Sequence, residues 1–277
     1  MPVRRFLTRL HHLRHNLRIL LQGTPIRLTT YVGRHPTSQL HLARTSRFSG
    51  RALTVGERSV LSIGAGAIID GNVMIGDDCT VRIDRNFKLL NGASLIVDDH
   101  GQVQIDKDCL VEAVSPFRAC LRVVRGSARL CANANLRGEV LVQEGQFWLG
   151  ANSFVNHGTE IRCDERVRIG DYVFVSYFVD IYDSNTHSLD WRVRQQEVED
   201  GYPNHTVHGR QYVEMAPVEL GDHVWVGKRA AILKGCSLGA RSVVGTRAVV
   251  TASCPEGSLL VGNPASVQPL CESDGTS

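Results

Sequence analysis

The chain has 277 residues, of which 43% are hydrophobic and only 6% aromatic, and its formal net charge is +3. No stretch of 18 apolar residues is present, which excludes a membrane-spanning helix. Eight Cys without a CxxC pair argue against a disulfide framework or a structural zinc site. The first residues lack the unbroken apolar stretch of a signal peptide, so we expect a cytoplasmic protein.

Residues 1–22 predict a basic amphipathic helix, because apolar residues recur at helical spacing on one face and five Arg lie opposite. The basic character extends further, since ten Arg and no acidic residue precede Glu57. Two interpretations stay open. The helix packs against the domain that follows and caps it, or it lies on an anionic surface such as that of the inner membrane. Residues 23–52 are expected to form a connecting segment.

A period of six residues dominates residues 53–268. In three separated blocks an aliphatic residue stands at every sixth position: Ile63, Ile69, Ile75, Val81; Leu149, Val155, Ile161; and Leu220, Val226, Ile232, Leu238, Val244, Val250. An α-helix would turn residues six apart to different faces. A coil with three short sides instead points each of them inward, and each turn buries its core against its neighbours. The period therefore predicts an all-β fold, a parallel β-helix. Residues 83–148 are less regular and are expected to add imperfect turns, and residues 269–277 are expected to form a tail.

The period stops at Ile181 and resumes near Val218, which predicts a loop excursion over residues 182–217. A long loop inside a compact domain is usually functional or disordered. His187 stands at the root of this loop, where a rigid turn can hold it. The unperturbed pKa of a His side chain, about 6.5, suits general-base work at neutral pH. His187 is therefore the candidate catalytic base, and the loop is expected to close over a neighbouring subunit.

Four segments together resemble the sugar O-acetyltransferases of bacterial polysaccharide assembly, relatives of the galactoside and maltose acetyltransferases. They are Ile181–Trp191, Leu220–Gly227, Ile232–Gly235 and Val261–Ala265. The resemblance covers about residues 149–268 and implies a left-handed coil of hexapeptide repeats that assembles as a homotrimer. It also implies direct transfer of an acetyl or larger acyl group from acetyl-CoA to a sugar hydroxyl, with His187 as the base. The acceptor-binding residues that it implies are Asn156, Asp164, Asn185 and Trp225.

The phosphate groups of coenzyme A call for basic side chains around them. The candidates for binding the coenzyme on the carboxyl-terminal turns are Lys228, Lys234, Thr246, Arg247 and Thr251. The sequence departs from the family pattern at two places. Ala252 replaces the usual Lys, and the late Arg is missing from residues 267–270. We therefore expect coenzyme A to be held more weakly, held differently, or held through Arg247.

Two other functions compete with acyl transfer. A zinc-dependent hydrolyase of the carbonic-anhydrase type shares the period but needs three His on one metal. His187 with His157 or His205 is conceivable, although no His-x₄-His spacing accompanies His187. The other is a non-catalytic scaffold. The preferred interpretation requires a sugar or glycan acceptor, with no metal and no nucleic-acid partner.

Overall fold

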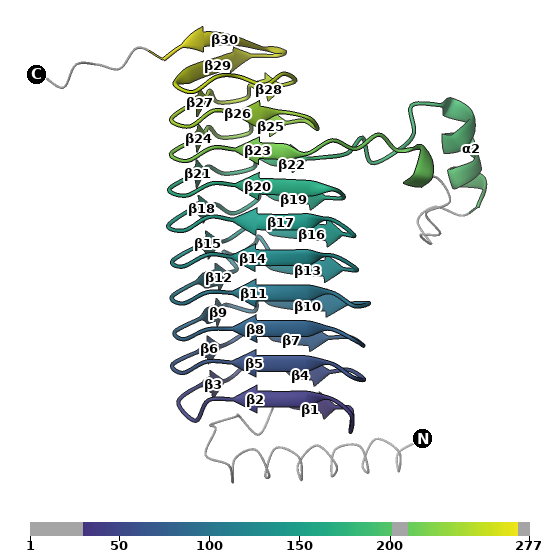
Figure 1. Cartoon of the computed structure of the whole chain (residues 1–277), viewed down its shortest axis with the longest axis vertical. Helices are drawn as coiled ribbons and strands as arrows, with labels where there is room; N and C mark the ends of the chain where they lie inside the picture. The colour runs from purple at the N-terminus through teal and green to yellow at the C-terminus, as the bar shows by residue number, and fades with distance from the viewer. Residues whose placement is uncertain (1–29, 201–209, 271–277) are drawn as a thin grey trace, which may run out of the picture.

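The computed structural model describes residues 30–200 and 210–270. Within them the chain winds into an elongated coil in which every turn contributes one strand to each of three sheets (Figure 1). From β1 to β28, strands three apart in the chain therefore pair side by side and in parallel. The predicted parallel β-helix is confirmed.

The first sheet comprises β1 (Tyr31–Arg34), β4 (Ala52–Val55), β7 (Asn72–Ile75), β10 (Ser94–Asp98), β13 (Cys120–Val124), β16 (Glu139–Gln143), β19 (Glu160–Cys163), β22 (Asp180–Tyr182), β25 (Ala231–Ile232) and β28 (Val249–Val250). The second sheet comprises β2 (Gln39–Leu42), β5 (Val60–Ile63), β8 (Thr80–Ile83), β11 (Gln102–Ile105), β14 (Ser127–Leu130), β17 (Gln146–Leu149), β20 (Arg166–Ile169), β23 (Val218–Leu220) and β26 (Ser237–Leu238).

The third sheet comprises β3 (Arg47–Phe48), β6 (Ile68–Ile69), β9 (Lys88–Leu90), β12 (Leu110–Glu112), β15 (Asn135–Leu136), β18 (Phe154–Val155), β21 (Phe174–Val175), β24 (Trp225–Val226), β27 (Val243–Val244), β29 (Ser258–Gly262) and β30 (Ala265–Pro269). We call the bend between the first and second sheets the first corner, that between the second and third sheets the second corner, and that between the third and first sheets the third corner.

The core is a column of aliphatic side chains inside the coil. Every aliphatic residue of the six-residue period is buried, and so are the small residues four positions later, such as Ala230 and Ala248. Six of the seven Cys in the described residues are buried, and all seven are free thiols. They therefore pack as small apolar groups.

The irregular region 83–148 also forms complete turns. Its strands in the first sheet have five residues where those near the carboxyl end have two, so two side chains point inward from each strand. In β10 these are Leu95 and Val97. The longer sides break the period of six while keeping the inward column intact.

The coil begins earlier than the sequence indicated. Residues from Tyr31 to Phe48 form the first turn, within the range 23–52 for which the sequence predicted a connecting segment. Arg34 stands at the position that buried Val55 takes in the next turn, and Leu40 and Leu42 are only partly buried. Arg34 therefore interrupts the six-residue period. The predicted helix over residues 1–22 and most of the predicted tail lie outside the described residues.

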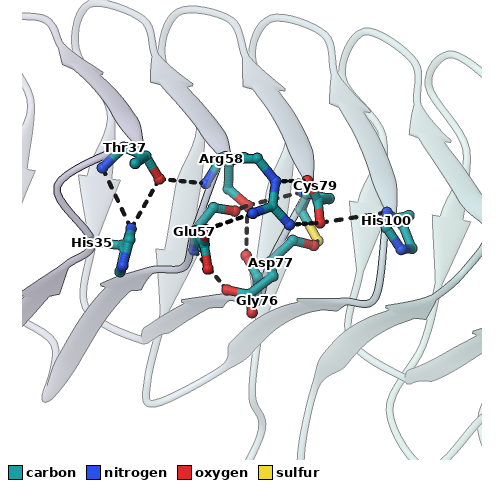
Figure 2. Close-up of polar contacts among 10 residues, drawn as sticks. His35, Thr37, Glu57, Arg58, Gly76, Asp77, Cys79 and His100 are labelled. Atoms are coloured by element: carbon teal, nitrogen blue, oxygen red, sulfur yellow. Dashed lines mark hydrogen bonds and ion pairs between the residues drawn. The ribbon is translucent and has the colours of Figure 1, made fainter.

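Polar side chains tie successive turns together along the first corner (Figure 2). The Arg58 guanidinium donates two hydrogen bonds of 2.6 Å to the carboxylate of Asp78, one turn further on. This contact holds the pKa of Asp78 below its usual range. Asp77 accepts a hydrogen bond from the backbone N–H of Glu57 at 2.6 Å. Such contacts fix the register between turns.

Two departures from the coil remain. Residues 183–200 and 210–217 lie outside the coil at the first corner and carry helix α2 (Trp191–Glu199) and the 3₁₀-helix η1 (Arg210–Tyr212), within the range predicted for the excursion. At the carboxyl end β30 folds back antiparallel on β29. Among the described residues, no helix has the length and apolar character needed to cross a bilayer.

Candidate functional site

The excursion leaves the coil as a short two-stranded stalk. Ser184 and Met215 form an antiparallel bridge. Backbone hydrogen bonds join Ala216 N to Asp183 O at 2.9 Å and Asn185 N to Glu214 O at 3.0 Å. The two arms therefore support each other where they emerge, and α2 stands away from the coil at the end of the stalk (Figure 1).

A buried carboxylate anchors the stalk. Asp183 is fully buried, and its two oxygens accept hydrogen bonds of 2.8 Å from the backbone N–H groups of Asp164 and Glu165 in the turn before. Burial raises the pKa of Asp183. The predicted acceptor residue Asp164 lies at this base, with its side chain only 8% exposed, and accepts a hydrogen bond from the Ser184 hydroxyl. Asp164 is thus part of the anchor.

His187 lies just beyond the stalk, and its side chain is 45% exposed. Its Nδ1 is 2.9 Å from Oε2 of Glu197 on helix α2. An ionised carboxylate only accepts hydrogen bonds, so this contact requires a proton on Nδ1. In the neutral ring Nε2 is then the nitrogen that can take up a proton. The pair therefore gives His187 the tautomer that a general base needs.

The sequence interpretation missed helix α2 and Glu197. Asp190 accepts the backbone N–H of Arg192 at 2.9 Å and caps the helix at its start. Arg194 donates to the backbone oxygen of Ser188 at 2.6 Å and folds the helix back on the loop that carries His187. The signal was present, because Asp is a preferred N-cap residue and a run without Gly or Pro follows it.

A polar link connects the stalk to the next turn of the coil. Glu214 Oε2 accepts a hydrogen bond from Asn185 at 3.3 Å and lies 3.2 Å from the Lys234 ammonium group. Asn185 was predicted to bind the acceptor and Lys234 to bind the coenzyme. Both lie at the first corner near His187, as does Thr251, which is exposed one turn further on.

The other predicted site residues lie at the opposite edge of the first sheet. Asn156 is buried at the third corner, where its Oδ1 accepts the backbone N–H of His157 at 2.9 Å. Trp225 points outward from β24 with 51% of its surface exposed, and its indole N–H is 3.4 Å from Ser176 Oγ. A three-residue strand of the first sheet, about 10 Å long, separates the two corners. One chain alone therefore does not bring Asn156 and Trp225 to His187.

Three of the coenzyme candidates stack at the third corner. Lys228 lies 5.8 Å from the centre of the Phe178 ring. Thr246 and Arg247 are exposed one turn further on, where Arg247 N donates to Lys228 O at 3.0 Å. The coenzyme candidates are thus divided between two corners of the coil.

An aromatic cluster beside Asn156 was not predicted. His157 stacks on Phe117 with ring centres 5.0 Å apart and contacts Tyr177 at 4.6 Å. Phe117 comes from the seven residues between β12 and β13, a corner longer than its neighbours. That extra length was the available signal, whereas from the sequence His157 was considered only as a conceivable zinc ligand.

The three-His arrangement of the zinc alternative is not present in the described part of the chain. There, no three His, Cys, Asp or Glu side chains are grouped as metal ligands. His157 and His187 lie at different corners, and His205 falls outside the described residues.

Comparison with known proteins identifies a repeat in the carboxyl-terminal part of the chain. Residues 217–252 match the hexapeptide repeat of succinyl-transferase. A Saccharomyces cerevisiae protein assigned as an acetyltransferase, YJL218W, is 33% identical over 130 residues, which are 47% of this chain and 59% of that protein. Nodulation protein L of Rhizobium meliloti is 33% identical over 120 residues, 43% of this chain and 57% of that protein. The chain thus spans less than two thirds of each of these relatives.

Solved structures of similar fold include acetyltransferases. A hexapeptide-repeat acetyltransferase of Vibrio cholerae O1 biovar eltor, in complex with acetyl coenzyme A, matches 48% of this chain and 61% of its own at 27% identity, with a TM-score of 0.37. The polySia-specific acetyltransferase NeuO matches 90% of this chain and 92% of its own at 17% identity, with a TM-score of 0.49. Residues 217–252 are thus hexapeptide repeats, and the chain is a parallel β-helix with sequence relatives among the acetyltransferases.

Proposed function

We propose that this protein is an O-acetyltransferase that moves an acetyl group from acetyl-CoA to a sugar hydroxyl in surface-polysaccharide assembly. The observation that carries the proposal is the contact between His187 and Glu197 beyond an anchored stalk. The Saccharomyces cerevisiae relative assigned as an acetyltransferase, together with the motif that surrounds His187, supports acetyl transfer.

The reaction is a direct transfer. Nε2 of His187 takes the proton of the acceptor hydroxyl as its oxygen attacks the thioester carbonyl carbon. The carbon–sulfur bond then breaks, and the imidazolium returns the proton to the leaving thiolate of coenzyme A. Glu197 holds the ring and stabilises its positive charge during the step. A positioned base of this kind contributes about 10²–10⁴ in rate.

The complete site in this proposal combines two copies of the chain, and the assembly is a homotrimer. The excursion projects from the coil and exposes Leu189, Trp191 and Val198. The third sheet presents an outward aromatic stripe that includes Phe174 and Trp225, about half of whose surface is exposed. Packing the excursion of one copy against this stripe buries both and brings Asn156 and Trp225 toward His187 of the neighbour.

Coenzyme A lies along the third corner in this arrangement, beside Lys228, Thr246 and Arg247, while Lys234 and Thr251 approach it from the neighbouring copy. Asp164 and Asn185 support the acceptor side through the stalk. We place the protein in the cytoplasm, peripheral to the inner membrane through the basic residues 1–22.

Subunit mixing tests both parts of the proposal. His187→Ala alone should reduce acetyl transfer to a screened sugar acceptor by about a hundredfold or more, and Trp225→Ala alone should also reduce it. Mixed assemblies of the two variants contain some sites with both residues intact, so activity should return. If mixing restores nothing, the site does not combine two chains. If His187→Ala keeps more than about a tenth of wild-type kcat, His187 is not the base.

A further inference from the structure

The outer face of the second sheet carries a basic hollow that the proposed reaction does not use. Its volume is about 400 Å³, and it is lined by residues of β8, β11, β14, β17 and β20. The lining includes Arg82, Arg129, Arg166 and Arg168, and none of its residues, all within the described chain, is acidic.

The strand register sets the spacing of these guanidinium groups. Arg82, Gln104, Arg129, Trp148 and Arg168 are direct neighbours on successive strands and form one outward column. Neighbouring strands lie about 4.8 Å apart. Three Arg of the column are therefore separated by two strands each, or about 10 Å, along the axis of the coil.

Trp148 contacts two of the three Arg side chains of the column. The guanidinium carbon of Arg129 is 4.8 Å from the centre of the Trp148 ring, and that of Arg168 is 5.5 Å away. Arg129 and Arg168 come from the strands on either side of Trp148, so the ring stands between them. Stacking on an aromatic face limits the freedom of an Arg side chain, and it leaves the edge of the guanidinium available for an anion.

Two of the four Arg side chains form ion pairs with carboxylates. Arg129 lies 3.0 Å from Asp106, and Arg166 lies 2.9 Å from Glu219. Over residues 30–200 and 210–270, no carboxylate lies within ion-pair distance of Arg82 or Arg168. Both side chains are exposed, so the hollow has net positive charge at its two ends.

A second outward column supplies neutral hydrogen-bonding groups. Gln102, Ser127, Gln146 and Arg166 are direct neighbours on successive strands. The small Ser127 lies between Gln102 and Gln146 in this column and also lines the hollow. Amide and hydroxyl groups beside guanidinium groups suit a ligand that offers hydroxyls as well as anionic groups.

The hollow reaches the base of the excursion. Arg166 directly follows Asp164 and Glu165, whose backbone N–H groups hold the Asp183 anchor. A linear ligand lying in the hollow along the coil axis would therefore have one end next to the stalk that carries His187.

We propose that this face binds an anionic oligosaccharide and that the acetyl acceptor is a polymer with acidic groups. Its carboxylates pair with Arg82 and Arg168, and its hydroxyls bond to Gln102 and Gln146. Duplex nucleic acid carries one charge per 3.4 Å along each strand, a density that Arg82 and Arg168, four strands or about 19 Å apart, do not match. The role of the face in acetylation rests on the proposed function, whereas the binding itself does not.

Binding is measured by titration calorimetry on the full-length protein without acetyl-CoA. The probe is a hyaluronan oligosaccharide, which carries an acid on alternate sugars, and the reference is an uncharged maltooligosaccharide. We expect only the acidic probe to bind, and added salt to weaken it. Arg82→Gln and Arg168→Gln should each weaken binding about tenfold, the loss of one hydrogen-bonded ion contact. The matched control is Arg122→Gln, an exposed Arg of the same turn as Arg129 on the first sheet.

Four results would overturn the proposal. They are no binding at low salt, an equal loss with Arg122→Gln, tighter binding of a single-stranded oligonucleotide, and a change of oligomeric state in Arg168→Gln by light scattering. The last would assign the face to a subunit contact. His187→Ala should bind the probe as wild type does, so failure of the proposed catalytic role leaves this result standing.

Discussion

Removing the Glu197 carboxylate tests the catalytic geometry most directly. Glu197→Gln keeps the size of the side chain but replaces the charged acceptor 2.9 Å from His187 Nδ1. A hydrogen bond to a charged group contributes about 1.5–3 kcal/mol. His187 is 45% exposed, so solvent competes and the lower value applies. About 1.5 kcal/mol corresponds to a loss of about tenfold in kcat.

The assay is initial-rate acetyl transfer at saturating acetyl-CoA, with KM for each substrate measured separately. We expect kcat to fall and KM for acetyl-CoA to stay within twofold or so, because Glu197 acts through His187 and not on the coenzyme. Glu199→Gln is the matched control, since Glu199 lies on the same helix and bonds only to Gln195 at 2.7 Å among the contacts described. Unchanged kcat in Glu197→Gln, or an equal loss in Glu199→Gln, would refute the assignment of Glu197 as a positioning residue.

Three further predictions concern the fold and its surroundings. Ala248 is fully buried, and Ala248→Leu would place a larger side chain in the packed core. The free energy of unfolding measured by chemical denaturation should therefore fall by about 1–3 kcal/mol. An unchanged value would mean that the assignment of Ala248 to the interior is wrong. Burial and neighbouring Glu160 raise the pKa of Asp180, so the stability that Asp180 contributes is present below about pH 4 and is lost as pH rises through the raised pKa. Asp180→Asn should therefore be more stable than wild type by about 0.2–1 kcal/mol at pH 7 but not at pH 4, and an equal difference at both values would contradict this. Full-length protein should sediment with anionic vesicles at low salt, each base near the surface contributing about 1 kcal/mol, and the form lacking residues 1–22 should not; if neither binds and the truncated form melts lower, the segment is a cap.

The fold was predictable from sequence because each side of a stacked coil repeats the same inward aliphatic position. Leu220, Val226 and Ile232 each point inward from a different side, so a single period records three sheets. The six-residue period was harder to recognise in the turns with longer strands, as at Leu95 and Val97, because the spacing of inward residues then differs from one side of the coil to the next. It failed between Tyr31 and Phe48, where Arg34 stands at the position that buried Val55 takes in the next turn.

The candidate site was only partly predictable. His187 stands out because the period stops before it, and its position at the stalk is as expected. Glu197 could not be assigned to it from spacing, because the nine residues between them have to turn back through α2 before the two side chains meet. The distance between Asn156 and His187 likewise follows from the corner at which each turn bends, which the period alone does not record.

The reversed strand β30 has a consequence for solubility. A coil of parallel strands ends in a free strand edge, and such edges invite pairing with another chain. At the carboxyl end β30 covers the edge of β29 and runs against the direction of every other strand in its sheet. A second coil stacked head to tail on this end would meet β30, which runs opposite to the direction of its own strands. The hairpin thus interrupts the one axis along which this architecture could extend into a fibre.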